Sequence, residues 1–515
     1  MSAPNGNSSA GTELPLNRAD EVKDLLTAIQ DLIIPFIAAA DEDAKTKHTG
    51  HGLKVEGGGP RTTLVEHHPP KKLESILQKE LEINDDASGK EGFMSLVETI
   101  MKYSVNTWDQ GFLDKLYSNT NAVGLVSELL LATLNTNAHV YQVSPVLTLI
   151  EKRSTKFLAS LFNLPPSTCG GISQPGGSAS NSTALVVARN TLYPETKTSG
   201  NGSLKLTVFT STHGHYSVEK AANLYGLGSS NVISVPVDAQ GRMIPSEFEK
   251  LVKESQSRGE TPFFLNATAG TTVLGSFDPF TQLSAICKAH NMWLHIDGSW
   301  GGPVIFSETH AKTRLAGAHL ADSITINPHK MLQVPTTCSF LLGADMNKFH
   351  RALTLPAGYL FHNAAGTSAD DIYDLADLTP QCGRRADSFK FFLAVQYYGA
   401  KHFSQLVQTA YEMAEYLLEG LKKSGKFVTI SPEPLPCLQV CFYYAKGGKL
   451  GENAEVNSQM TSEMANRLIS RGFMIDYAPG EKGKFFRVVV NGSTRKGTLD
   501  GLVRALEETA ADLGY

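Results

Sequence analysis

Two reactive side chains follow short apolar runs in the middle of the chain. Lys330 closes the motif Asn327-Pro328-His329-Lys330, which comes directly after the run Ser323–Ile326. Asp297 follows a second apolar run that begins at Trp293. An amine shielded from water can form a Schiff base. A carboxylate at the end of a buried run is costly unless it meets a partner, such as a protonated ring nitrogen.

Three further motifs carry polar groups at similar places. The stretch Gln174–Asn181 (QPGGSASN) precedes a helical segment, so its backbone N–H groups could hold a phosphate, or it could be a loop with a serine cap. Either His213 or His215 could stack on an aromatic ring, cap a helix or face solvent. The run Ala267–Thr272 (ATAGTT) could bond the polar edge of a ligand or form a tight turn.

The order of these groups predicts a binding site for pyridoxal 5'-phosphate (PLP). That cofactor requires an amine for its aldehyde, a carboxylate for its ring nitrogen and a seat for its phosphate. Taken singly, Lys330 could be a surface lysine, and Asp297 could be a helix cap or part of a buried ion pair. No metal is expected, because Cys437 and Cys441 are the one close cysteine pair and lack a second pair to complete a zinc site.

The elements that position these groups alternate along the chain. Short β-rich runs are separated by helical stretches from about 120 to 380, which favours a parallel sheet covered on both faces, with ligands beyond the carboxyl ends of its strands. The spacing of apolar residues over 22–37 predicts an amphipathic helix. A long helix is expected over 384–424. We predict a disordered tail and helical segment at 1–115, a large α/β domain at 116–390 and a smaller α+β domain at 391–515.

The composition excludes some classes of protein. The chain has 515 residues, 41% hydrophobic and 19% charged, as in an ordinary globular enzyme. Its net charge of −5 argues against a nucleic-acid binder. No apolar run reaches the roughly 18 residues of a membrane span. The polar, Ser/Gly-rich start resembles neither a signal peptide nor a transit peptide, and the scattered cysteines suggest free thiols, so a cytoplasmic location is expected.

The chain resembles the group II PLP-dependent amino-acid decarboxylases, most closely the branch with glutamate, cysteine-sulfinate and aspartate decarboxylases. The matching stretches run in order over roughly residues 70 to 515: 135–152, QPGGSASN (174–181), HYSVEKAA (215–222), NATAGTTVLGSFDP (266–279), WLHIDGSWGG (293–302), NPHK (327–330), AGYLFH (357–362), QCGRRADSFKF (381–391) and FFRVVV (485–490). The resemblance implies PLP fold-type I, aspartate-aminotransferase-like, and a homodimer with active sites at the subunit interface.

The resemblance also implies roles for individual residues. Lys330 would be the Schiff-base lysine, His215 would stack on the cofactor ring and Asp297 would pair with its nitrogen. Arg487, which interrupts an apolar run, would bind the substrate carboxylate, although a structural ion pair is the alternative. The phosphate region and its surroundings would be formed by Ala179, Ser180, Thr272, Ser299, Asn327 and His329.

Two departures from the family bear on the substrate and on proton transfer. Lys115 stands where animal members have a glutamine, and Tyr117 where serine is common, which favours a shorter diacid; alternatively, Lys115 pairs with a nearby carboxylate. The loop 362–379 differs from that of animal relatives, whose proton-donating tyrosine falls near Ala369 here. Tyr373 matches a second tyrosine, so either Tyr373 or another group is the acid.

The expected function is α-decarboxylation of an acidic L-amino acid: aspartate to β-alanine, cysteine sulfinate to hypotaurine or glutamate to GABA. An aromatic-amino-acid decarboxylase or aldehyde synthase of the same family is the alternative, and a catalytically silent homologue is a further one. Arg487 and Lys115 argue against an uncharged substrate pocket.

Overall fold

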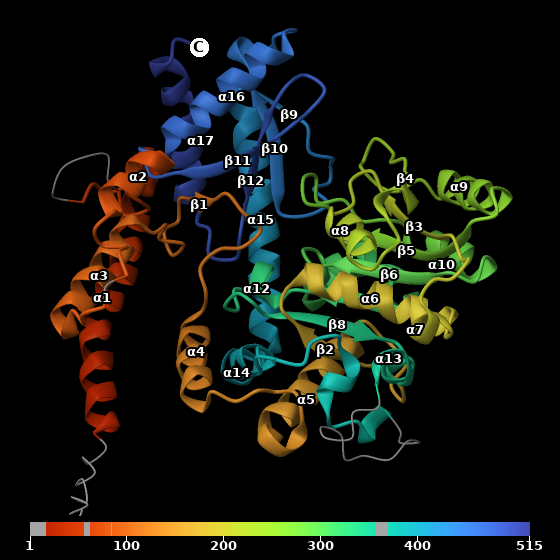
Figure 1. The fold of residues 1–515 in the computed structure, drawn as a ribbon. Coiled ribbons are helices and arrows are strands. Elements are labelled where there is room, and N and C mark those ends of the chain that lie inside the picture. Colours follow the sequence, from red (N-terminus) through yellow and green to blue (C-terminus); the bar gives the residue numbers. More distant parts are fainter. Residues whose placement is uncertain (1–16, 56–61, 84, 356–368) are drawn as a thin grey trace, which may run out of the picture.

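The computed structural model describes residues 17–55, 62–83, 85–355 and 369–515. These residues form an N-terminal helical arm, a central part built on a seven-stranded sheet and a C-terminal part built on a five-stranded sheet (Figure 1). Most of the expected disordered tail and the family stretch at 357–362 lie outside the described residues. None of the helices that are described is long and apolar enough to cross a membrane.

The seven-stranded sheet is mainly parallel, as the sequence predicts. Its order is β2-β8-β7-β6-β5-β3-β4, and β8 alone runs antiparallel to its neighbours. Most of its strands are buried along their whole length, which is typical of a sheet covered on both faces. The strands are β2 (Gly170–Gln174), β3 (Leu206–Ser211), β4 (Val232–Val235), β5 (Thr261–Thr268), β6 (Trp293–Gly298), β7 (Ser323–Ile326) and β8 (Ser339–Gly343).

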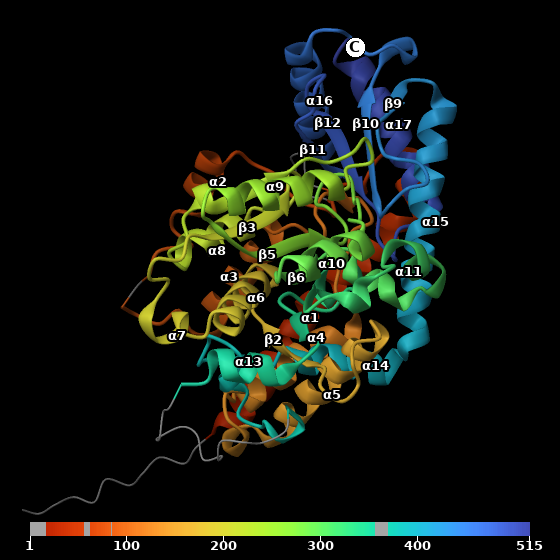
Figure 2. The ribbon, with the colours of Figure 1, turned by 90° about the vertical axis from the view of Figure 1, so that its right-hand side faces the viewer.

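Helices cover both faces of this sheet (Figure 2). Successive residues of a strand point to opposite faces; on β3, Val208 packs in one core cluster with Phe264, and Phe209 packs in the other with Leu265. The helices of this part are α4 (Ala122–Leu134), α5 (Pro145–Leu161), α6 (Gly177–Leu192), α7 (Thr196–Ser199), α8 (Ser217–Leu224), α9 (Pro245–Ser257), α10 (Phe280–Ala289), α11 (Glu308–Arg314), α12 (Pro328–Met331), α13 (Met346–Leu353) and α14 (Ser388–Tyr398).

The five-stranded sheet contains one strand from far earlier in the chain. Its order is β1-β11-β12-β10-β9, and β1 pairs with β11 in parallel while the other pairs are antiparallel. The strands are β1 (Phe112–Leu113), β9 (Phe427–Thr429), β10 (Gln439–Tyr444), β11 (Met474–Ala478) and β12 (Phe485–Val489). The accompanying helices are α15 (Ala400–Ser424), α16 (Ala454–Ile469) and α17 (Lys496–Asp512).

The N-terminal arm consists of α1 (Arg18–Thr46), α2 (Pro70–Leu77) and α3 (Gly89–Tyr103), and α1 contains the predicted amphipathic segment, with Pro35 inside it. A buried cation fixes the end of α1: Lys47 pairs with Asp43 and, at 2.7 Å, with Asp109. Because all three side chains are fully buried, the ion pairs compensate charges that would otherwise be costly.

The sequence prediction of one long helix over 384–424 is wrong. The stretch 384–424 is two helices, α14 and α15, separated at Gly399, whose φ is +80°. Glycine tolerates this left-handed conformation, so the chain turns there instead of continuing one helix. The expected boundary at residue 391 falls inside α14, and β1 joins the C-terminal sheet. We therefore keep the three-part division as a proposal about folding units.

Candidate active site

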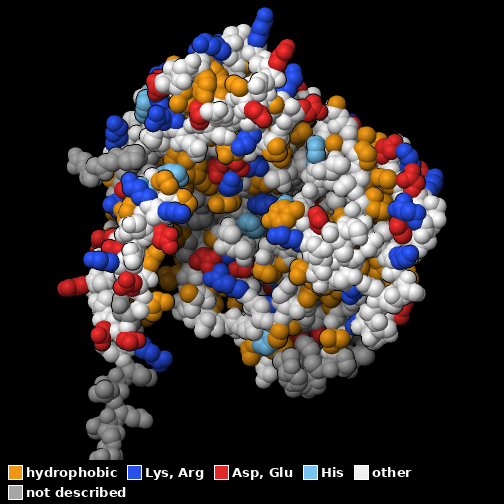
Figure 3. Space-filling view, turned by 45° about the horizontal axis from the view of Figure 1, so that its top comes forward, with side chains coloured by type: hydrophobic (Ala, Val, Ile, Leu, Met, Phe, Trp, Pro, Cys, Tyr) orange, Lys and Arg blue, Asp and Glu red, His pale blue; other side chains and the backbone are white. Residues whose placement is uncertain are grey.

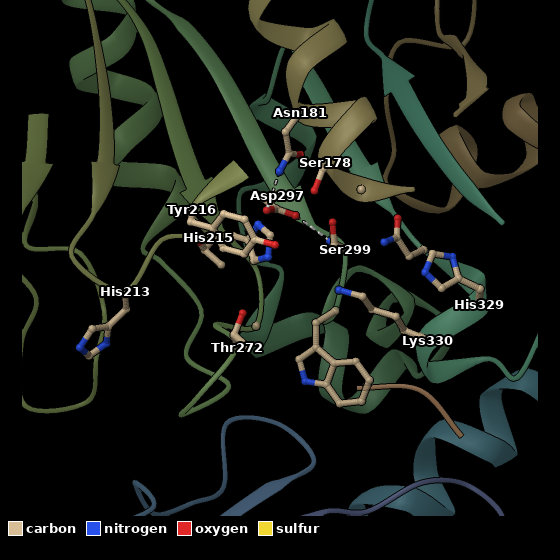
Figure 4. A pocket seen from close by; sticks show the side chains of 15 residues that line it. Ser178, Asn181, His213, His215, Tyr216, Thr272, Asp297, Ser299, His329 and Lys330 are labelled. Atoms are coloured by element: carbon tan, nitrogen blue, oxygen red, sulfur yellow. Dashed lines mark hydrogen bonds between the residues drawn. The ribbon is translucent and has the colours of Figure 1, made fainter. Parts of the chain in front are cut away.

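A cavity of about 220 Å³ lies at the carboxyl ends of the parallel strands. The turns after β2, β3, β5, β6 and β7 all reach it, as expected for a ligand site in such a sheet. Figure 4 shows the side chains that line it. Its lining consists of Gly177, Ser178, Asn181, His213, His215, Tyr216, Thr268, Gly270, Thr272, Asp297, Ser299, Trp300, Asn327, His329 and Lys330.

Lys330 and Asp297 reach this cavity from neighbouring strands. Asp297 belongs to β6 and pairs in register with Thr325 of β7, and Lys330 lies in α12, directly after β7. Burial lowers the pKa of Lys330, and the nearby Asp297 opposes part of that effect. A lowered pKa leaves more of the amine unprotonated and therefore nucleophilic. The sequence prediction that these two residues share one site agrees with this placement.

Asp297 remains ionised although it is buried. Burial raises the pKa of its carboxyl, but the hydrogen bond from Ser299 and the electrostatic effects of His215 and Lys330 outweigh burial, and the pKa lies below its usual value. The Ser299 backbone N–H donates to Oδ1 at 3.0 Å. Asn181 Nδ2 donates to Oδ2 at 2.8 Å. Asn181 was not among the predicted site residues, although it lies at the end of the QPGGSASN motif.

The glycine-rich turn brings backbone close to the cavity at the start of α6. A Cβ on Gly177 would lie 2.3 Å from Ser299 Oγ and 2.9 Å from Asn327 Nδ2, so only glycine fits without a shift of these neighbours. Ser178 lines the cavity, whereas the predicted Ala179 and Ser180 do not. The Ser180 hydroxyl is buried against Ser339 Oγ at 3.0 Å. Any phosphate contact from Ala179 or Ser180 would therefore use the backbone.

Three histidines surround the cavity in different ways. His215 points toward Asp297, whereas His213 points away from the other labelled side chains (Figure 4). The Ser217 N–H donates to His215 Nδ1 at 3.2 Å, so the proton of the neutral ring is on Nε2. Burial lowers the pKa of His215. Burial also lowers the pKa of His329 to about 4, and His329 Nδ1 lies 2.7 Å from the Cys338 carbonyl oxygen.

These residues fit PLP. Thr268 Oγ1 is buried beside the cavity and has no hydrogen-bond partner among the described residues, so it is available to a ligand. Lys330 offers an amine, Asp297 an anion, and Gly177 and Ser178 the amino end of α6, where anions bind favourably. Thr272, Ser299, Asn327 and His329 line the same space, and their predicted cofactor contacts remain proposals.

The predicted substrate-binding residues lie beside the cavity and not in its lining. Arg487 of β12 donates to the carbonyl oxygen of the cavity residue Thr272 at 2.9 Å. Lys115 pairs with Asp476 at 2.9 Å and with Asp114 at 3.4 Å, which is the carboxylate pairing named above as the alternative. Tyr117, which is 45% exposed, packs on Phe112 with ring centroids 5.6 Å apart.

Tyr373 is not in the cavity lining. Its ring lies 5.5 Å from the ring of Tyr141, and Lys152 Nζ lies 4.3 Å from its centroid. Residues 356–368 of the preceding loop lie outside the described residues. The structure of one chain therefore does not bring Tyr373 together with Lys330, and its role as an acid stays a prediction.

Comparison with known proteins agrees with this site. Residues 70–445 match the family model of the pyridoxal-dependent decarboxylase conserved domain. The chain is 51% identical over 496 residues to an L-aspartate decarboxylase of Metarhizium robertsii, covering 96% of this chain and 98% of the relative. It is 37% identical to a glutamate decarboxylase-like protein of Gibberella zeae, covering 97% and 99%.

A solved structure agrees with the fold. The crystal structure of mouse CSAD in apo form superposes with a TM-score of 0.84 at 31% identity, covering 95% of this chain and 99% of that chain. This similarity confirms the predicted fold-type I architecture with its smaller C-terminal part. The chain belongs to the pyridoxal-dependent decarboxylase family, and PLP is its cofactor.

Proposed function

We propose that this enzyme decarboxylates an acidic L-amino acid, with L-aspartate as the preferred substrate and β-alanine as the product. The observation that carries the proposal is the 51% identity, over nearly the full length of both chains, to an L-aspartate decarboxylase. The placement of Arg487 against Thr272 supports it, because a guanidinium beside the cavity can bind a carboxylate.

PLP, when bound, supplies an electron sink for the bond that releases carbon dioxide. We propose that the chain's own groups divide the remaining work. Lys330 provides the amine that holds the cofactor, and Asp297 provides the negative charge for its ring nitrogen. His215 would pack against the cofactor ring, and Arg487 would orient a substrate carboxylate. Gly177, Ser178, Thr272, Ser299, Asn327 and His329 position the phosphate end.

The acid that protonates Cα is proposed to be Tyr373. The support is its place in the loop before the family stretch QCGRR, where it matches a tyrosine of the animal relatives. Replacing Tyr373 with phenylalanine removes one hydroxyl and little volume. The variant is expected to release carbon dioxide while forming less β-alanine per turnover, because the proton is then added to the cofactor instead of Cα, so that the product leaves as an aldehyde and its amino group stays on the cofactor. Equal loss of both products would instead assign Tyr373 to folding or binding.

We further propose that the enzyme is a cytoplasmic homodimer. Support for a dimer comes from exposed apolar side chains that gather on α4, α5 and the turn between them: Val126, Leu129, Leu130, Leu134, Val143, Val146 and Leu149. Clusters of this kind mark protein interfaces. Hydrophobic side chains also lie along the hollow between the arm and the central body (Figure 3). All six cysteines are free, which suits a reducing compartment.

The substrate proposal is tested by measuring carbon dioxide release from L-aspartate, L-cysteine sulfinate, L-glutamate and L-tyrosine, with product identified by chromatography. Turnover is expected on the acidic substrates, with aspartate giving the highest kcat/KM. Activity on tyrosine alone would contradict the acidic-substrate proposal. Activity on glutamate above aspartate would retain the substrate class and correct the chain length.

A further inference from the structure

A line of hydrogen bonds runs through the buried layer behind Asp297. It passes from β6 to β7, returns to β6, continues to α6 and ends on β6. Trp293 Nε1 donates to Ser323 Oγ at 2.8 Å, and Ser323 Oγ lies 2.8 Å from His295 Nδ1. His295 Nε2 lies 3.0 Å from Asn181 Oδ1. Asn181 Nδ2 then donates to Asp297 Oδ2 at 2.8 Å.

The chemistry of the two ends gives this line one direction. Asp297 is ionised and can only accept, so the amide nitrogen of Asn181 must face it and the amide oxygen must face His295. His295 Nε2 therefore carries the proton and Nδ1 accepts from the Ser323 hydroxyl. At the far end, the Trp293 indole can only donate, so the Ser323 oxygen accepts from it and its hydrogen is directed to His295.

Every hydrogen-bonding position of the Asn181 amide is used. Its nitrogen also lies 3.1 Å from Ser217 Oγ, and its oxygen accepts from Thr325 Oγ1 at 3.0 Å. With two donors and two acceptor positions filled, the amide cannot turn over without breaking several bonds. Asn181 and His295 are almost fully buried, so water cannot replace a lost partner.

His295 remains neutral in this layer. Burial lowers its pKa to about 4, and its ring stacks on Phe264 with centroids 5.7 Å apart. A neutral, packed imidazole keeps one tautomer and presents its N–H to Asn181 at all times. Neutral polar groups that are fully paired can hold a buried anion in place without adding a second charge.

We propose that Asn181 and His295 are positioning residues that fix the orientation and the ionised state of Asp297 toward the ring nitrogen of PLP. Asn181 acts directly on the carboxylate, and His295 acts by holding the Asn181 amide in the one orientation that donates to Asp297. Ser323 and Trp293 hold the His295 tautomer in turn. This inference rests on the proposed role of Asp297.

The primary test replaces Asn181 with aspartate in the full chain. Asn181→Asp puts a carboxylate 2.8 Å from Asp297, and two carboxylates at that distance share a proton. The dissociation constant for PLP, measured by fluorescence titration, is expected to rise at least roughly tenfold. The absorption band of the bound cofactor is expected to shift relative to wild type. Asn190→Asp is the matched control, because Asn190 lies buried on the same helix and donates to the Ala352 carbonyl instead.

A second pair of variants tests the relay through His295. His295→Phe removes the N–H, whereas His295→Gln keeps an amide N–H near the same place. The phenylalanine variant is expected to reproduce the weaker PLP binding and the spectral shift, and the glutamine variant is expected to restore both to within about threefold of wild type. Circular dichroism shows whether Asn181→Asp folds. If it does not fold, the two His295 variants alone test the proposed positioning role.

The outcomes separate this inference from the role of Asp297. If Asp297→Asn weakens PLP binding while Asn181→Asp leaves both the dissociation constant and the spectrum within twofold of wild type, the inference is overturned and the role of Asp297 stands. If His295→Phe and His295→Gln weaken PLP binding and shift the spectrum equally, the proposed role of His295 is overturned. If Asp297→Asn itself binds PLP as wild type does, the proposed role of Asp297 fails, and this inference fails with it.

Discussion

Asp476 lies directly opposite Arg487 across the antiparallel pair β11–β12, and one of its carboxylate oxygens accepts from both Arg487 and Lys115. Asp114 pairs with the same lysine, and burial raises the pKa of its carboxyl. The two cations beside the cavity are thus balanced by two carboxylates. A substrate carboxylate that approaches Arg487 must compete with Asp476.

Replacing Asp476 with asparagine is expected to lower KM for L-aspartate. The change removes the competing negative charge and keeps the shape, and a partly exposed pair of this kind contributes about 0.2–1 kcal/mol, or up to roughly fivefold. Steady-state kinetics at low and high salt measure the effect, which should shrink as salt screens the charges. Glu433→Gln, which breaks a surface pair with Lys422, is the control for net charge. A higher KM would show that Asp476 orients Arg487 for the substrate.

Lys330→Ala is expected to abolish the absorbance near about 420 nm that a lysine-bound PLP gives. Its decarboxylase activity should fall by several orders of magnitude, because the variant has no amine at that position. Absorption spectra before and after dialysis against buffer measure the loss of bound cofactor. Lys253→Ala serves as a control, since Lys253 is exposed on α9 and pairs there with Glu249. Retention of the band in Lys330→Ala would refute the assignment of this lysine.

Arg384→Met is expected to destabilise the protein by about 3–5 kcal/mol. Arg384 forms a buried ion pair with Glu151 and donates to Ser173 Oγ at 3.1 Å, which anchors β2 to α5. Removing the cation leaves the Glu151 carboxylate buried without a counter-charge. Urea unfolding of the single variant and of Arg384→Met/Glu151→Gln measures the effect. The double variant should recover part of the loss, and an additive loss would show that the pair is not coupled.

The unfolding free energy of the cofactor-free protein is expected to fall as the pH decreases from about 6.5 to about 4. Burial lowers the pKa of His295 and of His329 to about 4, so over this window the unfolded chain binds protons that the folded chain does not. Stability therefore rises with pH through the window and is lost on acidification. Burial raises the pKa of Asp278 to about 6, which opposes the trend with a smaller shift.

Urea unfolding midpoints at several pH values measure this dependence. His329→Gln, which cannot be protonated in this range, should show a shallower fall than wild type. The same slope in both proteins would mean that His329 is not the buried neutral group inferred here.

Lys330 and Asp297 could be placed in one site from the sequence, because each follows a recognisable apolar strand. The carboxyl ends of parallel strands meet at one edge of the sheet. The sequence did not predict Asn181, whose partners Asp297 and His295 lie on β6, more than a hundred residues later in the chain. It allowed for a carboxylate partner of Lys115 but did not identify Asp476 as that partner. That pairing depends on the register of β1 against β11, which no local pattern specifies.

The two residues of β1 have a consequence for how this protein is made. Phe112 and Leu113 leave the ribosome long before Met474 and Ile475, with which they pair. Until that late strand arrives, β1 has no edge to join, and contacts of such high sequence separation form slowly. A fragment starting at residue 391 would lack β1 and would expose the edge of β11. An exposed strand edge can pair with another chain and so promotes aggregation. The C-terminal sheet is therefore expected to fold last, and only as part of the whole chain.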